Sequence, residues 1–409
     1  MKLSDVFTRV VESDVPVRFE AYDGSATGPS DAPVCIDIRT PMAVRYIASS
    51  PGELGLARAY VTGQLDVHGD LYDALRALSD PRLGRLSIRE RAQLVRDFGP
   101  GLLRPVPRPR EEVKLRGQRH SRRRDAEAIA HHYDVSNRFY EMFLGPSMAY
   151  TCAVYPRPDA TLEEAQHEKF DLVARKLDLK EGERLLDVGC GWGGMVMHAA
   201  EHYGVQALGV TLSRRQAEWA QKAIAEQGLS DRADVRFLDY RDAPGTSYDA
   251  VSSIGLTEHV GKGQLAAYFS FLRAKLRPEG RLLNHCITRP TTTAPAQAGK
   301  FISRYVFPDG ELEGVGTLVS AMQDNGLEVR HEENLREHYA RTLRAWVANL
   351  DEHWDESVRE VGEGRARVWR LYMAASRLGF DRDQIELHQV LGVRTSDDGT
   401  SGMPLRPTW

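Results

Sequence analysis

Cysteine is scarce in this chain, which has four cysteines among 409 residues. They are Cys35, Cys152, Cys190 and Cys286, and no two of them have the C-x-x-C spacing. This distribution argues against a disulfide framework and against a structural zinc site. It is typical of a protein that folds in a reducing cytoplasm.

Long apolar segments are also lacking. No uninterrupted apolar run approaches the roughly 20 residues that cross a bilayer. The first seven residues, Met-Lys-Leu-Ser-Asp-Val-Phe, contain no long apolar core of the kind found in a secretion signal. We therefore expect a cytoplasmic protein whose contact with a membrane, at its inner face, is peripheral.

The chain has no overall excess of basic charge, because its formal net charge is -4. This balance argues against a nucleic-acid binder. The charge is unevenly placed, however, and residues 82–124 contain 14 Lys or Arg against four Asp or Glu. Apolar residues are interleaved with these basic ones, so the segment either contacts anionic phospholipid headgroups or is a solvated linker. RNA binding is a third use, but interleaved aromatic residues are lacking.

The stretch Arg-Leu-Leu-Asp-Val-Gly-Cys-Gly-Trp-Gly-Gly-Met at residues 184–195 carries the strongest signal. An apolar run ends in Asp187 and glycines and is followed by more apolar residues, which predicts a buried strand that turns sharply into a helix. Gly189, Gly191 and Gly193 let the backbone pass close to a ligand, and amides at the helix start can face a carboxylate. The stretch therefore predicts a cofactor site.

The glycines alone leave two cofactors open. Gly189, Gly191 and Gly194 satisfy the dinucleotide fingerprint G-x-G-x-x-G. Arg214 and Arg215 follow the next predicted strand and could hold a 2'-phosphate, so an NADP-dependent oxidoreductase is one interpretation.

The acids near the glycines favour S-adenosylmethionine instead. A nicotinamide site needs an acid at the end of the second strand, but that strand ends in Thr211. Asp187 at the tip of the first strand suits an ammonium group, and the third strand ends in Asp239. An acid, glycines and a later acid are the pattern expected for S-adenosylmethionine.

Strands and helices are predicted to alternate around this stretch. We expect strands at 184–188, 206–211, 234–238, 248–254, 280–287 and 386–393, and helices at 162–179, 193–203, 213–227 and 263–276. This order predicts an α/β fold with a doubly wound parallel sheet, in which ligands bind at the carboxyl ends of the strands. Glu258, His259 and His285 lie at or near that edge, and we expect them to converge near the cofactor.

Composition divides the chain into four regions. We expect a small α+β domain at 1–80, a basic linker rich in proline and arginine at 81–125, a catalytic domain at 126–395 and a tail at 396–409. Within the catalytic domain, residues 290–380 break the alternation, which predicts an inserted cap of long helices over the active site. The first domain shows no catalytic constellation and is expected to serve packing or docking.

We expect no metal site. His131 and His132 are adjacent in a predicted helix, so their side chains point about 100° apart and cannot bind one ion in the usual way.

A phosphate-binding loop is not expected either. Lys262 lies between two glycines but lacks the remaining residues of such a loop.

Six ordered motifs make the chain resemble the cyclopropane-fatty-acid synthase family of S-adenosylmethionine-dependent lipid methyltransferases. They are HYDVSN at 132–137, YTC at 150–152, LDVGCGWG at 186–193, GVTLS at 209–213, EHVG at 258–261 and YVFPDG at 305–310. Residues 1–80 resemble, more weakly, the lipid-docking and dimerisation domain of the long bacterial members. The resemblance implies a class I methyltransferase fold and methylation of a cis double bond in a phospholipid acyl chain.

The resemblance also implies which residues form the site. For S-adenosylmethionine it implies Tyr133, Ser136, Tyr150, Asp187, Gly189, Gly191, Thr211, Leu212, Gln216, Asp239 and Tyr240. For catalysis it implies a bicarbonate ion held by Cys152, Glu258, His285, the backbone of Ile287, and Tyr339.

The chemistry requires such an arrangement. An alkene is a poor nucleophile, so the sulfonium methyl must be held in line with it in a dry pocket. The attack leaves positive charge on carbon, which aromatic faces can stabilise. A proton must then leave, and a bound bicarbonate can act as the base while Glu258 accepts its hydroxyl hydrogen bond.

The sequence departs from the commonest family pattern in two places. Leu256 and Thr257 precede Glu258 where many ring-forming members carry larger residues, and Asn284 and Cys286 flank His285. With the C-terminal tail, these residues resemble the actinobacterial members that make 10-methylene fatty acyl chains, which a reductase converts to 10-methyl chains. A cyclopropane product passes through the same cation and remains the alternative.

Other function classes are also open at this point. A methyltransferase of a sterol or small molecule would have the same fold, and a lipid-binding protein without activity would have the same pocket. The partners that we expect are an unsaturated phospholipid in a bilayer, a second copy of the chain in a dimer, and a reductase, with no nucleic acid.

Overall fold

The computed structural model describes residues 2–11, 15–79, 96, 106–113, 121–122, 124, 135–293 and 299–409. The chain forms two compact units. The first comprises Met1–Lys114, Gly299–Val306 and Trp354–Leu378, and the second comprises Leu115–Ala298, Phe307–His353 and Gly379–Trp409. Two segments of the region expected to be catalytic, 299–306 and 354–378, therefore belong to the first unit.

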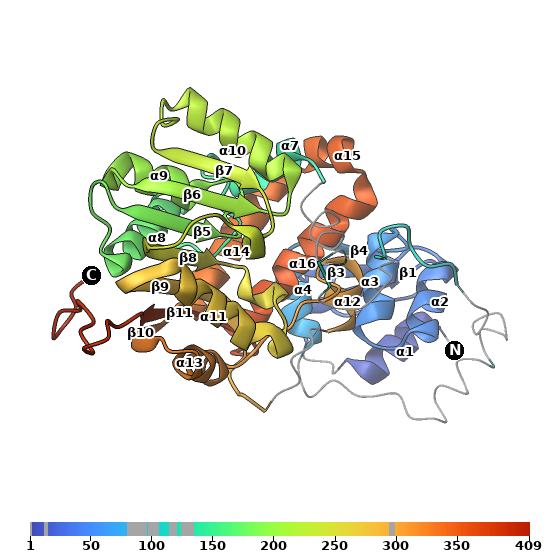
Figure 1. The fold of residues 1–409 in the computed structure, drawn as a ribbon. Coiled ribbons are helices and arrows are strands. Elements are labelled where there is room, and N and C mark those ends of the chain that lie inside the picture. Colours follow the sequence, from blue (N-terminus) through green and yellow to red (C-terminus); the bar gives the residue numbers. More distant parts are fainter. Residues whose placement is uncertain are drawn as a thin grey trace. The chain divides into compact units, whose positions relative to one another are not determined.

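The first unit contains a four-stranded sheet with the order β2-β1-β3-β4 (Figure 1). The strands are β1 (Val17–Ala21), β2 (Ala26–Thr27), β3 (Val34–Ile38) and β4 (Leu65–His68), and the helices are α1 (Leu3–Val10), α2 (Pro41–Ser49), α3 (Glu53–Val61), α4 (Leu71–Leu78), α12 (Lys300–Tyr305), α15 (Trp354–Val361) and most of α16 (Glu363–Asp381). Side chains alternate between the faces of a strand, so Val34, Ile36 and Ile38 of β3 enter the core together.

Buried ion pairs join the segments of the first unit. Arg367 of α16 donates from Nη1 to Oδ1 of Asp66 at 3.0 Å, and Arg58 of α3 donates from Nε to Oε1 of Glu112 at 2.5 Å. The guanidinium of Arg377 lies 3.5 Å from the ring centroid of Tyr72. The contacts of Arg367 and Arg377 attach residues 354–378 to β4 and α4, about 300 positions earlier in the sequence.

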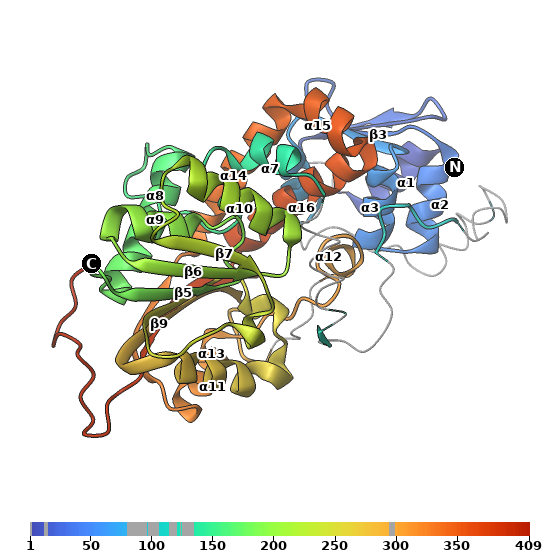
Figure 2. The same ribbon diagram turned by 45° about the horizontal axis from the view of Figure 1, so that its top comes forward.

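The second unit contains a seven-stranded sheet with the order β10-β11-β9-β8-β5-β6-β7, and strands β5, β6 and β7 run across the view in Figure 2. The strands are β5 (Arg184–Val188), β6 (Gln206–Thr211), β7 (Ala233–Phe237), β8 (Tyr248–Ile254), β9 (Leu276–Thr288), β10 (Glu328–Asn334) and β11 (Glu386–Val393). Strands β5 to β9 run parallel to one another, whereas β11 is antiparallel to both β9 and β10. The predicted α/β fold with a parallel sheet is confirmed, and β11 adds one reversed strand to it.

Helices cover both faces of this sheet (Figures 1 and 2). One core cluster packs the sheet against α8 (Leu162–Leu177), α9 (Gly194–Tyr203) and α10 (Arg214–Glu226). The other packs it against α11 (Leu265–Lys275) and α13 (Val315–Asp324). Because both faces are covered, the central strands are apolar almost throughout, as in residues 185–188 of β5, all of which are buried.

Residues 290–380, which we expect to form an inserted cap, also contain a strand of the large sheet. Residues 290–380 do contain the long helices α14 (Arg336–Glu352) and α16, but they also contain β10, a strand of the main sheet. Strand β10 reads Glu-Val-Arg-His-Glu-Glu-Asn and lies at the sheet edge, where solvent replaces one neighbour. Its polar residues hide the alternation that marks a strand in a sequence.

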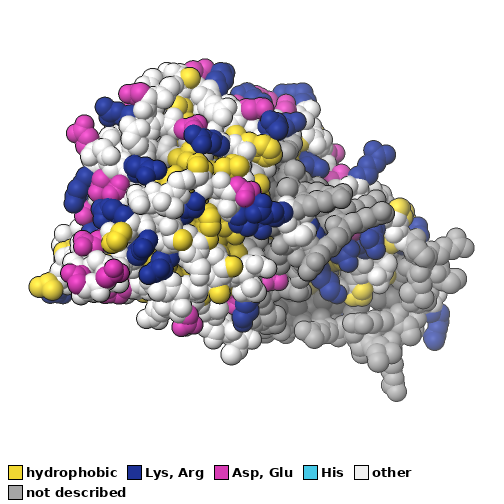
Figure 3. Space-filling view, in the orientation of Figure 1, with side chains coloured by type: hydrophobic (Ala, Val, Ile, Leu, Met, Phe, Trp, Pro, Cys, Tyr) yellow, Lys and Arg dark blue, Asp and Glu magenta, His cyan; other side chains and the backbone are white. Residues whose placement is uncertain are grey.

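Most of the basic linker lies outside the described residues, but two of its arginines are placed in the second unit. Arg122 donates from Nη1 to Oδ2 of Asp242 at 2.8 Å, and Arg124 donates from Nε to Oδ2 of Asp309 at 2.6 Å. Basic and acidic side chains are interspersed on the visible face of the part that carries the large sheet (Figure 3). Among the described residues, no helix has the length and apolar character needed to span a bilayer.

Candidate active site

A cavity of about 200 Å³ lies in the second unit at the carboxyl ends of β5, β6 and β8. Its wall includes eight of the residues expected to bind the cofactor, which are Tyr150, Asp187, Gly189, Gly191, Thr211, Leu212, Gln216 and Tyr240. Apolar side chains complete the wall, among them Met148, Phe170, Leu256 and Phe271. Most of the residues that the resemblance implies for cofactor binding therefore lie around one cavity.

The glycine turn between β5 and α9 forms the floor of the cavity. Gly189, Gly191 and Gly193 have φ angles of 73°, 55° and 80°, in the left-handed region that glycine adopts without strain. A Cβ placed on Gly189 would lie 3.1 Å from the Cβ of Leu256, so a larger residue would push that side chain. Among the described residues, a Cβ on Gly191 would meet only Nε2 of Gln216, at 4.0 Å, because this position faces the open cavity.

Asp187 is the buried acid of the cavity. It ends β5 next to the glycines, is 2% exposed, and accepts a 2.6 Å hydrogen bond from the Ser252 hydroxyl of β8. Burial raises the pKa of Asp187 to about 7, although the Ser252 hydrogen bond and the nearby charge of Lys169 oppose this shift. A ligand with a positive charge would stabilise the ionised carboxylate of Asp187 and could donate a hydrogen bond to it.

Lys169 of α8 is a second buried charge, and sequence analysis missed it. Its Nζ donates to the Thr151 hydroxyl at 3.0 Å and lies 3.5 Å from the ring centroid of Phe170. Burial lowers the pKa of Lys169 to about 7, while Cys152 and Asp187 act in the opposite direction. The charge of Lys169 therefore interacts with both Cys152, an expected catalytic residue, and Asp187, the acid of the cofactor cavity.

Polar groups at the end of β6 are held in place by one another. The Thr211 hydroxyl donates to Oε1 of Gln216 at 2.7 Å, and the Ser213 hydroxyl caps α10 by accepting from the Gln216 amide at 3.2 Å. These contacts fix the carboxamide of Gln216 at the wall of the cavity. They also account for the helix start directly after β6.

Two of the expected cofactor residues that the structure describes, Asp239 and Ser136, do not line the cavity. Asp239 follows β7 and pairs with Arg241, whose Nη2 lies 2.6 Å from Oδ2, and this pairing helps to hold the pKa of Asp239 below its usual value against the effect of burial. Ser136 caps α7 (Asn137–Leu144), with 3.4 Å between its hydroxyl and the Phe139 amide. Tyr133 lies outside the described residues.

Glu258 is buried and has one oxygen without a partner. The Ile287 amide donates to its Oε1 at 2.7 Å, whereas no described group bonds to its Oε2. Burial raises the pKa of Glu258 to about 7, and the hydrogen bond from Ile287 opposes the rise. The expected role of the Ile287 backbone is thus changed in one respect, because its amide already bonds to Glu258.

His285 lies two residues before Ile287 on β9 and is 1% exposed. Lys176 donates to Oε1 of Gln389 at 2.7 Å, so the amide nitrogen of Gln389 faces Nδ1 of His285 at 3.2 Å. Nδ1 is then an acceptor, which places the ring proton on Nε2. Burial pushes the pKa of His285 well below its usual value, and Nε2 has no partner among the described residues.

Cys152 and Tyr339 approach the same backbone carbonyl. The thiol of Cys152 lies 3.8 Å from the Leu335 oxygen, and the Tyr339 amide donates to that oxygen at 3.2 Å. The Leu335 amide in turn donates to Leu387 of β11, and Leu387 is paired with Ile287 across the sheet. Backbone contacts therefore link the segments that carry Cys152, Tyr339 and Ile287 in one neighbourhood of the second unit, where Ile287 also bonds to Glu258.

Aromatic rings connect this neighbourhood to the cofactor cavity. The ring of Tyr150, at the cavity wall, lies 5.3 Å from that of Trp346, which lies 6.0 Å from the ring of Tyr339. Tyr140 packs between Tyr150 and Trp192, with its ring centroid 5.8 and 4.7 Å from theirs. Such faces can stabilise a cation without reacting with it.

The geometry answers two expectations about the strand ends. His259 lines the cavity, as expected, whereas Glu258 and His285 lie beyond its wall, with Glu258 at a smaller hollow of about 10 Å³. Arg214 lies 4.6 Å from the ring centroid of Phe237, and Nη1 of Arg215 donates to the Val135 carbonyl at 3.4 Å. Both arginines are thus engaged with protein groups rather than arranged for a 2'-phosphate.

Comparison with known proteins gives consistent matches over most of the chain. A family model described as mycolic acid cyclopropane synthetase matches residues 120–390. A probable fatty acid methyltransferase of Mycobacterium tuberculosis is 52% identical over 419 residues, covering 100% of this chain and 97% of the relative. A probable fatty acid methyltransferase of Pseudomonas putida is 38% identical over 399 residues, covering 95% of each chain.

Solved structures match a large part of the chain. The cyclopropane synthase MmaA2 from Mycobacterium tuberculosis has a TM-score of 0.62 and 33% identity, covering 65% of this chain and 98% of its own. The mycolic acid cyclopropane synthase CmaA1, solved with SAH and CTAB, has a TM-score of 0.61 and 32% identity, covering 65% and 97%. The residues matched by the family model include the glycine turn, Glu258 and His285.

Proposed function

Because the chain belongs to the mycolic acid cyclopropane synthetase family, and is thus an S-adenosylmethionine-dependent methyltransferase that acts on lipids, we propose that it methylates a cis double bond in a phospholipid acyl chain. The observation that carries this proposal is the buried carboxylate of Glu258, whose Oε2 has no partner among the described residues, next to a strand that holds neutral His285. A buried acceptor of this kind can hold the base that must remove a proton from a methylated hydrocarbon.

The cavity fits the methyl donor. Asp187 can accept from an amino group, the turn at Gly191 leaves space for a ligand against the backbone, and Gln216 presents a fixed carboxamide. S-adenosylmethionine supplies an electrophilic methyl group when bound. The residues of this chain orient it, exclude water from it and present aromatic faces to the positive charge that develops on the acyl chain.

The neighbourhood of Glu258 also fits a small oxyanion that carries one hydroxyl, such as bicarbonate. His285 offers an Nε2 proton, and Glu258 offers Oε2 as an acceptor, and neither atom has a partner among the described residues. Tyr339 and the buried thiol of Cys152 lie in the same neighbourhood, through Leu335. Bound bicarbonate would supply a base that cannot be alkylated on the protein, and Glu258 would hold its hydroxyl.

Three of the four residues that depart from the common family pattern, Thr257, Asn284 and Cys286, are in contact with one another. The Thr257 hydroxyl donates to Oδ1 of Asn284 at 2.6 Å, and Nδ2 of Asn284 lies 3.3 Å from the sulfur of Cys286. These contacts lie beside Glu258 and His285. The positions of these two residues affect which proton is removed from the methylated acyl chain. The resemblance of these residues to those of methylene-forming members supports the 10-methylene product over the cyclopropane product, and a reductase would then act on the methylene group.

The proposal also includes the setting of the reaction. The acyl chain belongs to a phospholipid of a bilayer, which the enzyme reaches by peripheral contact at the cytoplasmic face, and residues 1–80 serve docking and dimerisation. The interleaved basic and apolar residues of 82–124 support the membrane contact.

Product analysis tests the proposal. The full chain is expressed in a host whose phospholipids contain oleoyl chains, and the fatty acid methyl esters are analysed by mass spectrometry. We expect a 10-methylene ester that is absent from the Glu258→Gln variant. A cyclopropane ester would contradict the branch that we favour, and unmodified oleate with active, cofactor-bound protein would contradict the substrate class.

A further inference from the structure

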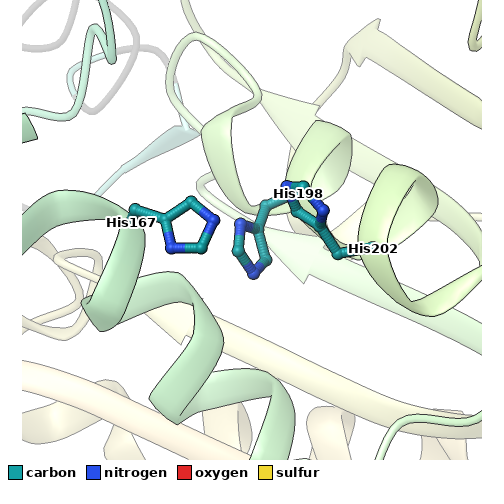
Figure 4. A group of neighbouring side chains, drawn as sticks. All are labelled: His167, His198 and His202. Carbon is teal, nitrogen blue, oxygen red and sulfur yellow. The ribbon is translucent and has the colours of Figure 1, made fainter. Parts of the chain in front are cut away.

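Three histidines outside the cofactor cavity face one another in the second unit (Figure 4). His167 comes from α8, and His198 and His202 lie one turn apart on α9. One ring nitrogen from each residue lies within 4.8 Å of the others, and the ring centroids are 4.6 to 5.2 Å apart. Side chains from two helices thus converge on one point.

The spacing of these nitrogens suits a tetrahedral metal ion. Residues four apart on a helix share a face, so His198 and His202 can bind one ion together. In a zinc site with Zn–N distances of about 2.0–2.1 Å, the nitrogens lie about 3.4 Å apart. Each ring would therefore need to move by about 1 Å or less, which a small side-chain rotation provides.

The burial of His198 gives an independent reason to expect a ligand. This side chain is 6% exposed, and its Nε2 forms no hydrogen bond with any described group. A buried polar atom without a partner is rare in native proteins and calls for an explanation such as an ion. Oδ1 of Asp171 lies 3.7 Å from this nitrogen, too far for a hydrogen bond but close enough to reach a shared ion.

The other two histidines leave a route to the solvent. His167 and His202 are exposed, and the His202 side chain is 42% exposed. Oε2 of Glu201 lies 3.7 Å from Nε2 of His202, where a carboxylate can orient a ligating imidazole. The cluster therefore combines a buried ligand, two accessible ligands and nearby acids.

We propose that His167, His198 and His202 bind one divalent transition metal ion and that the ion cross-links α8 to α9. Three imidazoles suit Zn²⁺, Ni²⁺ or Cu²⁺, whereas Mg²⁺ and Ca²⁺ prefer oxygen ligands. Among these ions Zn²⁺ accepts the tetrahedral arrangement most readily, with Asp171 or a water as fourth ligand. This proposal differs from the sequence analysis, in which we expected no metal site.

The position of the site gives the ion a structural consequence. Helix α8 carries Lys169 and Phe170 to the wall of the cofactor cavity, and α9 starts at the glycine turn. A Cβ on Gly194 would lie 2.6 Å from Cζ of Phe170, so these two helices already meet closely beside the cavity. An ion between them would stabilise the folded protein because it binds that state and not the unfolded chain.

The test uses the full chain without an affinity tag, freed of metal by a chelator. Zn²⁺ is titrated calorimetrically, Co²⁺ is titrated with visible absorption as the readout, and thermal unfolding is followed with and without Zn²⁺. We expect one ion per chain, the intense visible bands of tetrahedral Co²⁺ without a near-ultraviolet thiolate band, and a Tm that rises by several degrees. No saturable binding, or a thiolate band, would overturn the proposal.

Two variants from different helices make the test specific. His167→Gln and His202→Gln remove exposed ligands, so the metal-free proteins should fold with unchanged Tm. Loss of a supporting group alone costs about 10–100-fold in metal affinity, so loss of a direct ligand should cost at least about 100-fold. The control is His68→Gln, whose side chain is 58% exposed on β4, and it should bind Zn²⁺ as the wild type does. Equal affinity in all three variants would refute the site.

Discussion

The backbone amide of Ile287 donates a 2.7 Å hydrogen bond to Oε1 of Glu258, and this contact divides the two oxygens of one buried carboxylate between different tasks. Oε1 is held by β9, while Oε2 has no partner among the described residues and remains available to a substrate or ion. The same strand carries His285 two residues earlier. The relation between Glu258 and Ile287 therefore sets where a proton can be accepted.

Glu258→Gln tests this division of tasks. The new side chain can still accept from the Ile287 amide, but its nitrogen donates where Oε2 accepted. We expect turnover to fall by at least about 100-fold, the lower range for loss of an acid–base group. Affinity for S-adenosylhomocysteine and the Tm should change little, and Glu226→Gln, at an exposed ion pair of α10, serves as the control. Retained turnover would exclude an essential role for the carboxylate.

The binding of S-adenosylhomocysteine should depend on pH through Asp187. Its pKa of about 7 in the free protein means that the carboxylate is protonated below that pH, whereas an ammonium ligand binds the ionised form. Affinity should therefore fall by up to about tenfold per pH unit below 7 and level off above it. Calorimetry between pH 5 and 8.5 measures this, and Asp187→Asn should bind weakly with no such slope.

The same group should affect the stability of the ligand-free protein. A carboxyl whose pKa is raised on folding stabilises the native state fully below its unfolded pKa, near 4, and this contribution is lost as the pH rises through about 7. Asp187→Asn removes the cost of the buried charge, so at pH 8 it should raise the free energy of unfolding by up to about 4 kcal/mol. Urea unfolding at pH 4 and 8 is the measurement, and equal effects at both would contradict the assignment.

Lys169→Met tests the electrostatic role of the buried amine. The charge of Lys169 lowers the pKa of Asp187, so its removal should move the midpoint of the pH profile for S-adenosylhomocysteine binding to higher pH. Methionine keeps most of the volume against Phe170, so a purely structural effect would change affinity without moving the midpoint. Lys222→Met, at a side chain that is 76% exposed on α10, is the matched control.

Cys152→Ser should retain activity within about tenfold of the wild type. Burial raises the pKa of the Cys152 thiol, so the group is not a thiolate nucleophile at neutral pH. The thiol donates to the Ala153 carbonyl at 3.2 Å, a contact that a hydroxyl can replace. A turnover assay with Cys35→Ser as the control checks this, and complete loss of activity would indicate a covalent role.

Membrane binding should depend on exposed arginines of the linker rather than on those that form ion pairs. Arg108 and Arg110 are exposed, whereas Arg122 pairs with Asp242. Each basic residue at an anionic surface contributes about 1 kcal/mol, so Arg108→Gln with Arg110→Gln should weaken binding to anionic vesicles by about 10–30-fold at low salt. Arg122→Gln should have less effect. Unchanged vesicle affinity in the double variant would argue against a membrane contact by this segment.

The sequence predicted four strands of the large sheet closely. Strands β5, β6, β8 and β11 have the predicted bounds, because buried strands consist of short apolar runs between turn residues. The glycine turn and the acid that precedes it were found for the same reason, since only certain residues permit that backbone. Strand β10 was missed because its edge position allows polar side chains on both faces.

The parts of the site that were missed depend on packing between distant segments. Lys169 in a helix rich in charged residues is indistinguishable in sequence from a solvated lysine, and only the fold buries it against Phe170. His198 and His202 have a spacing suited to a metal, but His167 precedes them by thirty-one positions. The bond between Ile287 and Glu258 likewise requires a strand and a loop to meet.

The way the first unit is assembled limits how the protein can be shortened. Residues 354–378 pack with the N-terminal sheet, yet the chain then continues through the end of α16 into β11, in the middle of the catalytic sheet. A truncation that starts after residue 114 would leave Arg367 without Asp66 and Arg377 without Tyr72. The first unit is therefore built from both the N-terminal region and residues 354–378. A recombinant fragment that lacks the N-terminal region would need the exposed helix surface at 354–378 redesigned as well.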